Sequence, residues 1–215
     1  MEATRRPLTS RNTRWAAAIA GLLARNGVRP NFISVASIVF AAGAGLCLWF
    51  VGYEGKSAAP WLFIGAAALI QLRLLCNLFD GMVAIEGGFK TKSGEIYNEL
   101  PDRFSDAFIL IGAGYCLPPS DGMPLLGWLC AVLAVMTAYA RALGASAGAG
   151  QQFCGPMAKP HRMATLTVAC VVSALLVWMK VEFPLMKWTL VLIATGCVVT
   201  VFRRTHRIIR ELEAR

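Results

Sequence analysis

Six long apolar runs, separated by short polar connections, leave few folds open to this chain of 215 residues. A helix of about 20 apolar residues crosses the hydrocarbon core of a bilayer, where no water is available to unpaired backbone groups. With 57% hydrophobic and only 15% charged residues, the chain is more apolar than a soluble domain of this size. The sequence therefore predicts an all-α integral membrane protein with six transmembrane helices: Phe32–Tyr53, Pro60–Ala84, Asp102–Cys116, Leu125–Leu143, Met163–Met179 and Leu185–Phe202.

The basic residues gather in the connections and indicate how the chain lies in the membrane. The formal net charge is +9, and most of the 21 Lys and Arg residues fall in connections on one side of the predicted bundle. The positive-inside rule places that side and both termini in the cytoplasm, which predicts a protein of the cytoplasmic (inner) membrane. Such charge suits anionic lipid headgroups, and we expect no nucleic-acid partner because no aromatic and basic platform is present.

Three regions follow from this pattern. Residues 1–30 form a basic juxtamembrane segment in which Trp15, Ile19 and Leu22 fall on one helical side, which predicts an amphipathic helix at the interface. A simple positive-inside flank is the alternative. Residues 31–203 form the six-helix domain, and residues 204–215 form a basic cytoplasmic tail.

Cysteine and histidine usage indicates neither a disulfide framework nor a zinc site. The seven cysteines are scattered, mostly within apolar runs, and include no Cys-x-x-Cys pair. Only two histidines are present. We expect the cysteines to be small packing residues.

Residues 77–106 interrupt the apolar pattern with carboxylates, amides and glycines. Two sets recur at helical spacing, one on each side of a short glycine-containing link: Asn77, Asp80, Gly81 and Ala84, then Gly94, Asn98, Asp102 and Asp106. A carboxylate at the centre of a membrane helix costs roughly 2.5–3.5 kcal/mol, so several together need a reason. The usual reasons are a metal, a proton path or a polar substrate, and we expect both sets to face one pocket.

Four basic residues near this stretch are candidates for binding substrate. Arg73 lies one turn before the polar set on the same face, where it can snorkel or pair with a carboxylate or a substrate phosphate. Arg141 ends the fourth run, and Lys159 and Arg162 follow in the next connection. They are either positive-inside residues of a flexible connector or groups that hold phosphate, and we expect the second. Glu99 is interpreted as a solvated loop charge.

The polar stretch resembles the signature of the CDP-alcohol phosphotransferase family, Asp-x2-Asp-Gly-x2-Ala-Arg, then eight or nine residues, then Gly-x3-Asp-x3-Asp. Every spacing is kept here: Asn77-x2-Asp80-Gly81-x2-Ala84-Ile85, eight residues, then Gly94-x3-Asn98-x3-Asp102. The resemblance extends to a Pro-Asn-x-Ile-Ser before the first run and a Tyr-x-Arg near the end of the fourth. It implies six transmembrane helices, a homodimer, and transfer of a substituted phosphate from a CDP-linked lipid such as CDP-diacylglycerol to an alcohol, with release of CMP.

The resemblance also implies roles for the matching residues. Asp80 is a ligand of a divalent cation, Mg²⁺ or Mn²⁺, which bridges phosphate oxygens. Asp102 is the general base and a further metal ligand. The other predicted metal ligands are Asn77, Asn98 and Asp106. The predicted substrate-binding positions are Gly81, Ala84, Gly94, Arg73, Arg141, Lys159 and Arg162.

The chain departs from the signature at three positions. Asn77 and Asn98 replace aspartates, and Ile85 replaces an arginine. Amide oxygens can ligate Mg²⁺, but each replacement removes one negative charge and weakens divalent binding. Asp106, one turn beyond Asp102, can restore one carboxylate.

Asn98 and Asp106 can also have a purely structural role. Asn98, with Pro101 three residues later, can cap the third helix. Asp106 can pair with Arg73 or Arg103. The corresponding alternative function is a catalytically impaired homologue that binds a lipid or nucleotide. A cation transporter is less well supported, since no inverted repeat is visible.

The sequence leaves the acceptor alcohol open. The basic connection from Arg141 to Arg162 favours a phosphorylated or inositol-like alcohol, while serine, choline, glycerol phosphate and another lipid stay possible.

Overall fold

The computed structural model describes residues 13–53, 57–89, 93–117 and 123–214. Within these ranges the chain is all-α and forms seven helices: α1 (Arg14–Arg25), α2 (Pro30–Val51), α3 (Ala59–Glu86), α4 (Gly94–Gly114), α5 (Met123–Ser146), α6 (Lys159–Trp178) and α7 (Leu185–Glu213). The first twelve residues of the predicted amphipathic segment lie outside the described ranges, as do Lys56, Lys90 and Lys92.

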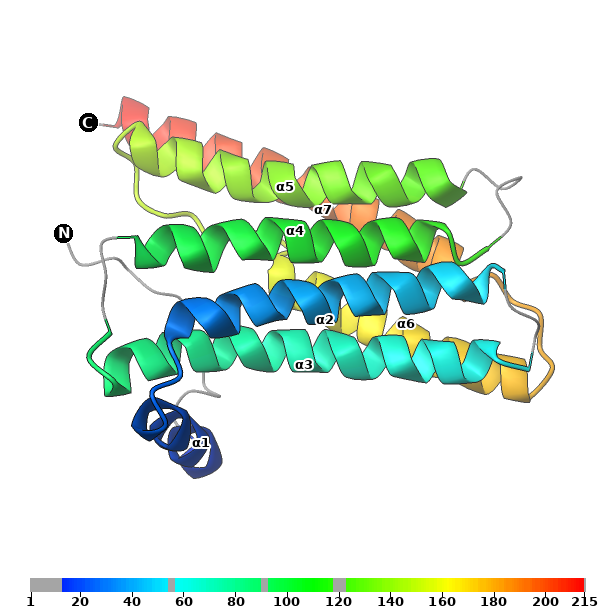
Figure 1. The fold of residues 1–215 in the computed structure, drawn as a ribbon. Coiled ribbons are helices and arrows are strands. Elements are labelled where there is room, and N and C mark those ends of the chain that lie inside the picture. Colours follow the sequence, from blue (N-terminus) through cyan, green and yellow to red (C-terminus); the bar gives the residue numbers. More distant parts are fainter. Residues whose placement is uncertain (1–12, 54–56, 90–92, 118–122, 215) are drawn as a thin grey trace.

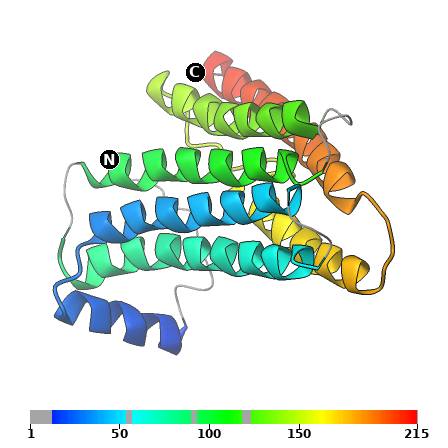
Figure 2. The ribbon, with the colours of Figure 1, turned by 45° about the vertical axis from the view of Figure 1, so that its right-hand side comes forward.

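Six of these helices form a closed bundle. Around it, α2 packs on α3, α3 on α6, α6 on α7, α7 on α5, α5 on α4, and α4 again on α2. Figures 1 and 2 show α1 lying across one end of the bundle, where it contacts α3. The carboxyl ends of α3, α5 and α7 and the amino end of α4 reach this same end (Figure 1). Residues far apart in the sequence therefore meet there.

Five of the described helices are long and apolar enough to cross a membrane, namely α2, α3, α5, α6 and α7. This indicates a multi-pass membrane protein, as the sequence predicts. The expected third span, Asp102–Cys116, corresponds to α4, which begins earlier, at Gly94, and carries the charged residues Asp102, Arg103 and Asp106. It packs between α2 and α5 in the bundle but is not among the five candidate spans, so a six-span topology stays a prediction of the sequence.

Local sequence explains several helix boundaries. Pro30 is the first residue of α2, and Pro60 and Pro160 are the second residues of α3 and α6. Proline suits this first turn because its missing N–H has no intrahelical partner there in any case. At the other end of the chain, α7 runs without a break through residues 203 and 204, where the sequence predicts a separate tail.

The amino-terminal helix α1 packs on the bundle through small residues. Ala16 and Ala20 are fully buried, and the ring of Trp15 meets the ring of Phe79 edge-on with centroids 6.1 Å apart. Leu22, by contrast, is 61% exposed. The helix itself is present, and its place at the membrane interface stays a prediction.

Small residues allow the closest helix contacts in the bundle. A Cβ atom added to Gly127 of α5 would lie 2.8 Å from the Cα atom of Gly114 of α4 and 2.8 Å from the carbonyl oxygen of Leu110. Membrane helices depend on such close backbone approach because lipid supplies no hydrophobic drive for helix association. All seven cysteines are free thiols, and four of them, Cys116, Cys130, Cys170 and Cys197, are buried where small packing residues are expected.

We predict that Gly127→Ala destabilises the bundle by about 1–3 kcal/mol, because the new methyl group meets only backbone atoms of α4. Thermal unfolding in detergent measures this loss. Gly65→Ala is the matched control, since its Cβ would lie 3.6 Å from the Cys47 sulfur, an ordinary contact. An equal melting temperature for both variants would contradict the close α4–α5 contact.

Candidate active site

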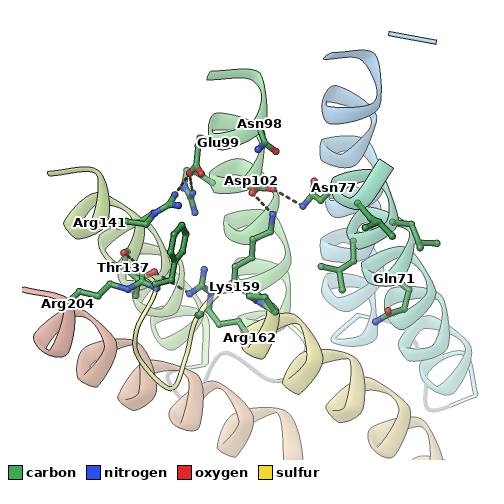
Figure 3. Close-up of a pocket in the computed structure, with 18 of the residues that line it drawn as sticks. Gln71, Asn77, Asn98, Glu99, Asp102, Thr137, Arg141, Lys159, Arg162 and Arg204 are labelled. Carbon is green, nitrogen blue, oxygen red and sulfur yellow. Dashed lines mark hydrogen bonds and ion pairs between the residues drawn. The ribbon is translucent and has the colours of Figure 1, made fainter. Parts of the chain in front are cut away.

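Asp102 of α4 lies at the centre of a polar network that joins three helices. Its Oδ1 accepts a hydrogen bond from Asn77 Nδ2 of α3 at 2.8 Å and a longer one from Arg73 Nη2 at 3.4 Å. Its Oδ2 forms an ion pair with the ammonium group of Lys159 at the start of α6 (Figure 3). The two predicted polar faces, before and after the link, therefore meet at this carboxylate.

Asp80 is held separately on the α2 side of α3. It is 4% exposed and accepts a hydrogen bond from Ser34 Oγ of α2 at 2.7 Å and one from the Gly81 backbone N–H at 2.5 Å. Ser34 is a partner that the motif did not indicate. Within the part of the chain that the structure describes, Asp80 forms no ion pair with a basic residue.

Asp106 is buried between two arginines. Its Oδ1 accepts a hydrogen bond from Arg73 Nη2 at 2.7 Å, and its Oδ2 accepts one from Arg162 Nη2 at 2.6 Å. The side chains of Arg73, Arg162 and Asp106 are 0%, 1% and 2% exposed. The pairing of Asp106 with Arg73, one of the alternatives in the sequence, is confirmed. Each of its oxygens is thus bonded to an arginine, and the role of Asp106 as a metal ligand stays a prediction.

A cavity of about 460 Å³ opens beside Asp102. Of the residues predicted for the site, it is lined by Asn77, Asn98, Asp102, Arg141, Lys159 and Arg162. It is also lined by residues that the sequence did not single out, among them Gln71, Glu99, Thr137, Phe153 and Arg204 (Figure 3). Six helices, α1 and α3 to α7, contribute to this wall, so only the tertiary fold assembles it.

The open edge of the cavity carries a second ionic cluster. Arg141 Nη2 donates a hydrogen bond to Glu99 Oε2 at 2.6 Å, and Glu99 also pairs with Arg103 one turn along α4. The Arg141 guanidinium lies 5.2 Å from the centre of the Phe153 ring. Burial raises the pKa of Glu99, but its hydrogen bond from Arg141 and the two positive charges outweigh burial and hold that pKa below its usual value. Glu99 therefore lies within α4 and in an ion-pair cluster, so its interpretation as a loop charge is wrong, while its side chain is 39% exposed.

The connection between α5 and α6 is fixed against α7. Gly155 has φ +115°, and a Cβ there would lie 2.5 Å from the Cγ2 atom of Thr200, so only glycine fits. The Met157 N–H donates to Thr200 Oγ1 at 3.0 Å, and Arg204 Nε donates to the Cys154 carbonyl at 2.9 Å. This docking sets the start of α6 and with it the position of Lys159.

Several predicted residues lie away from the cavity wall. Arg73 is fully buried, is bonded to carboxylates and does not line the cavity, and its role in substrate binding stays a prediction. Gly81, Ala84 and Gly94 are partly exposed but do not line the cavity. Asn98 does line it, and because α4 begins at Gly94, Asn98 is inside the helix rather than at its cap.

The oxygen donors near Asp102 fit a hard divalent cation in their chemistry. Asp80, Asp102, Asn77 and Asn98 offer carboxylate and amide oxygens, which Mg²⁺ and Mn²⁺ prefer. Among the described side chains, however, no three His, Cys, Asp or Glu residues lie close enough together to hold a metal ion. A cation here would therefore also need amide oxygens and oxygens of the substrate.

A family model decides where this chain belongs. The model of CDP-alcohol phosphatidyltransferase matches residues 27–203, which include α2 to α6 and most of α7. The chain belongs to this family. Its members are transferases of phospholipid synthesis that act on CDP-linked donors with a divalent cation.

Two curated proteins illustrate the sequence similarity. Inner membrane protein YnbA of Escherichia coli is 26% identical over 140 residues, and the match covers 65% of each chain, slightly less than two thirds of that protein. Phosphatidylinositol phosphate synthase of Mycolicibacterium smegmatis is 25% identical over 198 residues, covering 88% of this chain and 82% of the synthase.

Solved structures of the Mycobacterium tuberculosis phosphatidylinositol phosphate synthase share the fold. The one with CDP-DAG bound has a TM-score of 0.76 at 22% identity, covering 91% of this chain and 94% of the synthase. The one in complex with manganese and citrate has a TM-score of 0.74 at 21% identity, covering 90% and 88%. At these identities the likeness shows the fold alone.

We predict that Arg73→Met destabilises the protein by about 3–5 kcal/mol, because Asp106 then keeps a buried charge with one counter-charge fewer. Thermal unfolding in detergent measures the loss. Arg103→Met is the control, since Arg103 and Glu99 are 20% and 39% exposed and the pair should contribute about 1 kcal/mol or less. Similar melting temperatures for the two variants would show that the buried ion pair contributes no more to stability than the exposed one.

Proposed function

We propose that this chain transfers a phosphatidyl-type group from a CDP-linked lipid, such as CDP-diacylglycerol, to an alcohol and releases CMP. One observation carries the proposal: Asp102, the last residue of the family signature, faces a cavity whose wall is rich in positive charge. A diphosphate donor brings negative charge to such a wall, and an alcohol needs a nearby base to lose its proton.

The charge of the cavity suits this donor. Five cationic side chains line it, against two carboxylates from Glu99 and Asp102: Arg103, Arg141, Lys159, Arg162 and Arg204. The side chains of Lys159 and Arg141 are 22% and 16% exposed, so substrate can reach them. We propose that these two exchange their carboxylate partners for phosphate oxygens when the donor binds.

The proposed step uses Asp102 as the base. The acceptor hydroxyl oxygen forms a bond to the lipid-side phosphorus of the donor, while the bond from that phosphorus to the oxygen of CMP breaks. The hydroxyl proton passes to Asp102, whose Oδ2 is free to take it once Lys159 has moved to the phosphates. A divalent cation held by Asp80, Asp102 and the amides would neutralise charge on the phosphates.

The family and the charge pattern also suggest how the protein is oriented in the membrane and how it assembles. We propose that the cavity faces the cytoplasm, with α1 at the membrane interface and α4 as the sixth span. Gly81, Ala84 and Gly94 would then line the approach of the nucleotide, where small residues let it come near the backbone. The functional unit is proposed to be a homodimer.

A second candidate is a lipid- or nucleotide-binding homologue with impaired catalysis. It is favoured by the two amides at signature positions and by the lack of a three-residue metal cluster in the described part of the chain. Both candidates keep the cavity and its charge, so only turnover separates them.

The deciding experiment is CMP release by purified protein in detergent, with CDP-diacylglycerol, a panel of alcohols, and Mg²⁺ or Mn²⁺ against a chelator. Release that needs both the cation and one alcohol supports the transferase. Folded protein that binds the donor lipid but releases no CMP with any alcohol or cation favours the binding homologue.

We predict that Asp102→Asn lowers CMP release by about 10²–10⁴-fold, the usual contribution of a general base, and leaves folding intact. Glu213→Gln makes the same chemical change on an exposed residue near the end of α7 and should keep full activity. Full activity in Asp102→Asn would remove the proposed base.

We predict that Asn77→Asp tightens Mn²⁺ binding roughly tenfold, because it adds a carboxylate next to Asp102. Electron paramagnetic resonance of free Mn²⁺ during titration measures this without turnover. Asn26→Asp, at the exposed end of α1, is the control. Unchanged affinity in Asn77→Asp would exclude residue 77 from the cation site.

A further inference from the structure

The last turns of α7 contact the α5–α6 connection through one face of the helix. Arg204, Ile208 and Glu211 recur at helical spacing and therefore share this face. Arg204 and Ile208 are buried, and Glu211 is partly buried. Figure 1 shows these turns beside the carboxyl end of α5, where a Cβ added to Gly144 would lie 2.5 Å from the Ile208 Cδ1 atom. This face of α7 is thus directed at α5 and at the connection that follows it.

Glu211 binds the connection at two points. Its Oε1 accepts a hydrogen bond from the Gly150 N–H at 2.7 Å, and its Oε2 accepts one from Gln152 Nε2 at 2.9 Å. Hydrogen bonds to an ionised carboxylate are stronger than those between neutral groups. One side chain of α7 therefore fixes the backbone at residue 150 and the side chain of residue 152.

The same connection carries two contacts of Arg141, which lines the cavity. Gln151 Oε1 accepts a hydrogen bond from Arg141 Nη1 at 3.3 Å, and the Phe153 ring centre lies 5.2 Å from the Arg141 guanidinium. Along the chain these two residues alternate with Gln152 and Cys154, which α7 holds by hydrogen bonds. The position of the connection against α7 thus sets where Arg141 finds these two contacts.

The third partner of Arg141 is the one that a phosphate would replace. Glu99 is 39% exposed, and solvent screens its ion pair with Arg141. When Arg141 leaves Glu99 for a phosphate oxygen, its contacts with Gln151 and Phe153 persist and direct the guanidinium plane. Arginine binds phosphate through donors of fixed planar geometry, so a guanidinium that is already oriented loses less freedom on binding.

We propose that Glu211 is a positioning residue that acts through Gln151 and Phe153 to orient Arg141 for the phosphate group of a substrate. The inference rests on the proposed function, which assigns phosphate binding to Arg141. It adds a residue outside the match to the family model, which covers residues 27–203. The diphosphate of the donor and a phosphate on an acceptor share the chemistry that Arg141 recognises, and binding measurements with separate probes distinguish these two sources.

Equilibrium binding in detergent tests the proposal without turnover. Dissociation constants are measured for CDP-diacylglycerol as the donor and for glycerol phosphate and inositol phosphate as phosphorylated acceptors. Glu211→Gln keeps an oxygen for the Gly150 N–H but presents an amide donor to Gln152. We expect the dissociation constant of one of these probes to rise roughly tenfold, the effect of one lost hydrogen bond to a charged group.

The control is Glu213→Gln, which makes the same chemical change on an exposed residue of the same turn and should leave binding unchanged. The probe that Glu211→Gln weakens identifies which phosphate Arg141 holds. Unchanged dissociation constants for every probe that the wild type binds would overturn the proposal.

A double-mutant cycle separates positioning from a general loosening of the connection. In an Arg141→Gln background, where Lys159 still supports binding, Glu211→Gln should change the dissociation constant by no more than about twofold. Equal weakening in both backgrounds would overturn the proposal. Gln152→Met removes the same hydrogen bond from the side of the connection and should repeat both results, which keeps the test decisive if Glu211→Gln does not fold.

CMP release distinguishes failure of this inference from failure of the proposed function. Wild-type protein that binds CDP-diacylglycerol but releases no CMP with any alcohol overturns the transferase, and the binding measurements still decide the role of Glu211. Wild-type protein that releases CMP, with equal dissociation constants before and after Glu211→Gln, overturns the positioning role and leaves the transferase standing. Wild-type protein that binds none of the three probes overturns both.

Discussion

The buried carboxylate of Asp106 holds together the polar interior of this membrane protein. It accepts hydrogen bonds from Arg73 of α3 and Arg162 of α6, and all three side chains are almost completely enclosed. An arginine inside a membrane protein needs a counter-charge, because neither lipid nor a dry core can solvate it. Three helices are thereby fixed at one level of the bundle, and the cavity lies beside this level.

From this anchor the polar groups become more exposed towards the edge of the cavity. The Arg162–Asp106 pair is 1% and 2% exposed, the Lys159–Asp102 pair 22% and 10%, and the Arg141–Glu99 pair 16% and 39%. Coulombic attraction weakens as solvent enters, so we expect the inner pair to be the most strongly coupled and the outer pairs, under the proposed function, to exchange with a ligand. Burial thus decreases from the Arg162–Asp106 pair to the Arg141–Glu99 pair, and with it the strength of the ion pairs.

The variant signature changes the charge balance and keeps the geometry. Asn77 still reaches Asp102 from α3, as an aspartate could not without an intervening cation, because two carboxylates would repel each other. Lys159 contacts the other oxygen of Asp102. The amide of Asn77 and the ammonium group of Lys159 thus contact the two oxygens of this carboxylate.

Hydropathy and motif spacing were enough to predict an all-α membrane protein and its family. They also predicted that the two polar faces share one pocket, and the structure brings Asn77 of the first face to Asp102 of the second. They were not enough to show which basic residues reach the cavity. Arg204 lies in a basic stretch with Arg203 and Arg207, and only its burial against the α5–α6 connection distinguishes it. Likewise, Arg162 and Asp106 are 56 positions apart. The periodicity of a helix specifies which face a residue occupies, whereas the rotation and neighbours of that helix in the bundle decide what the face meets.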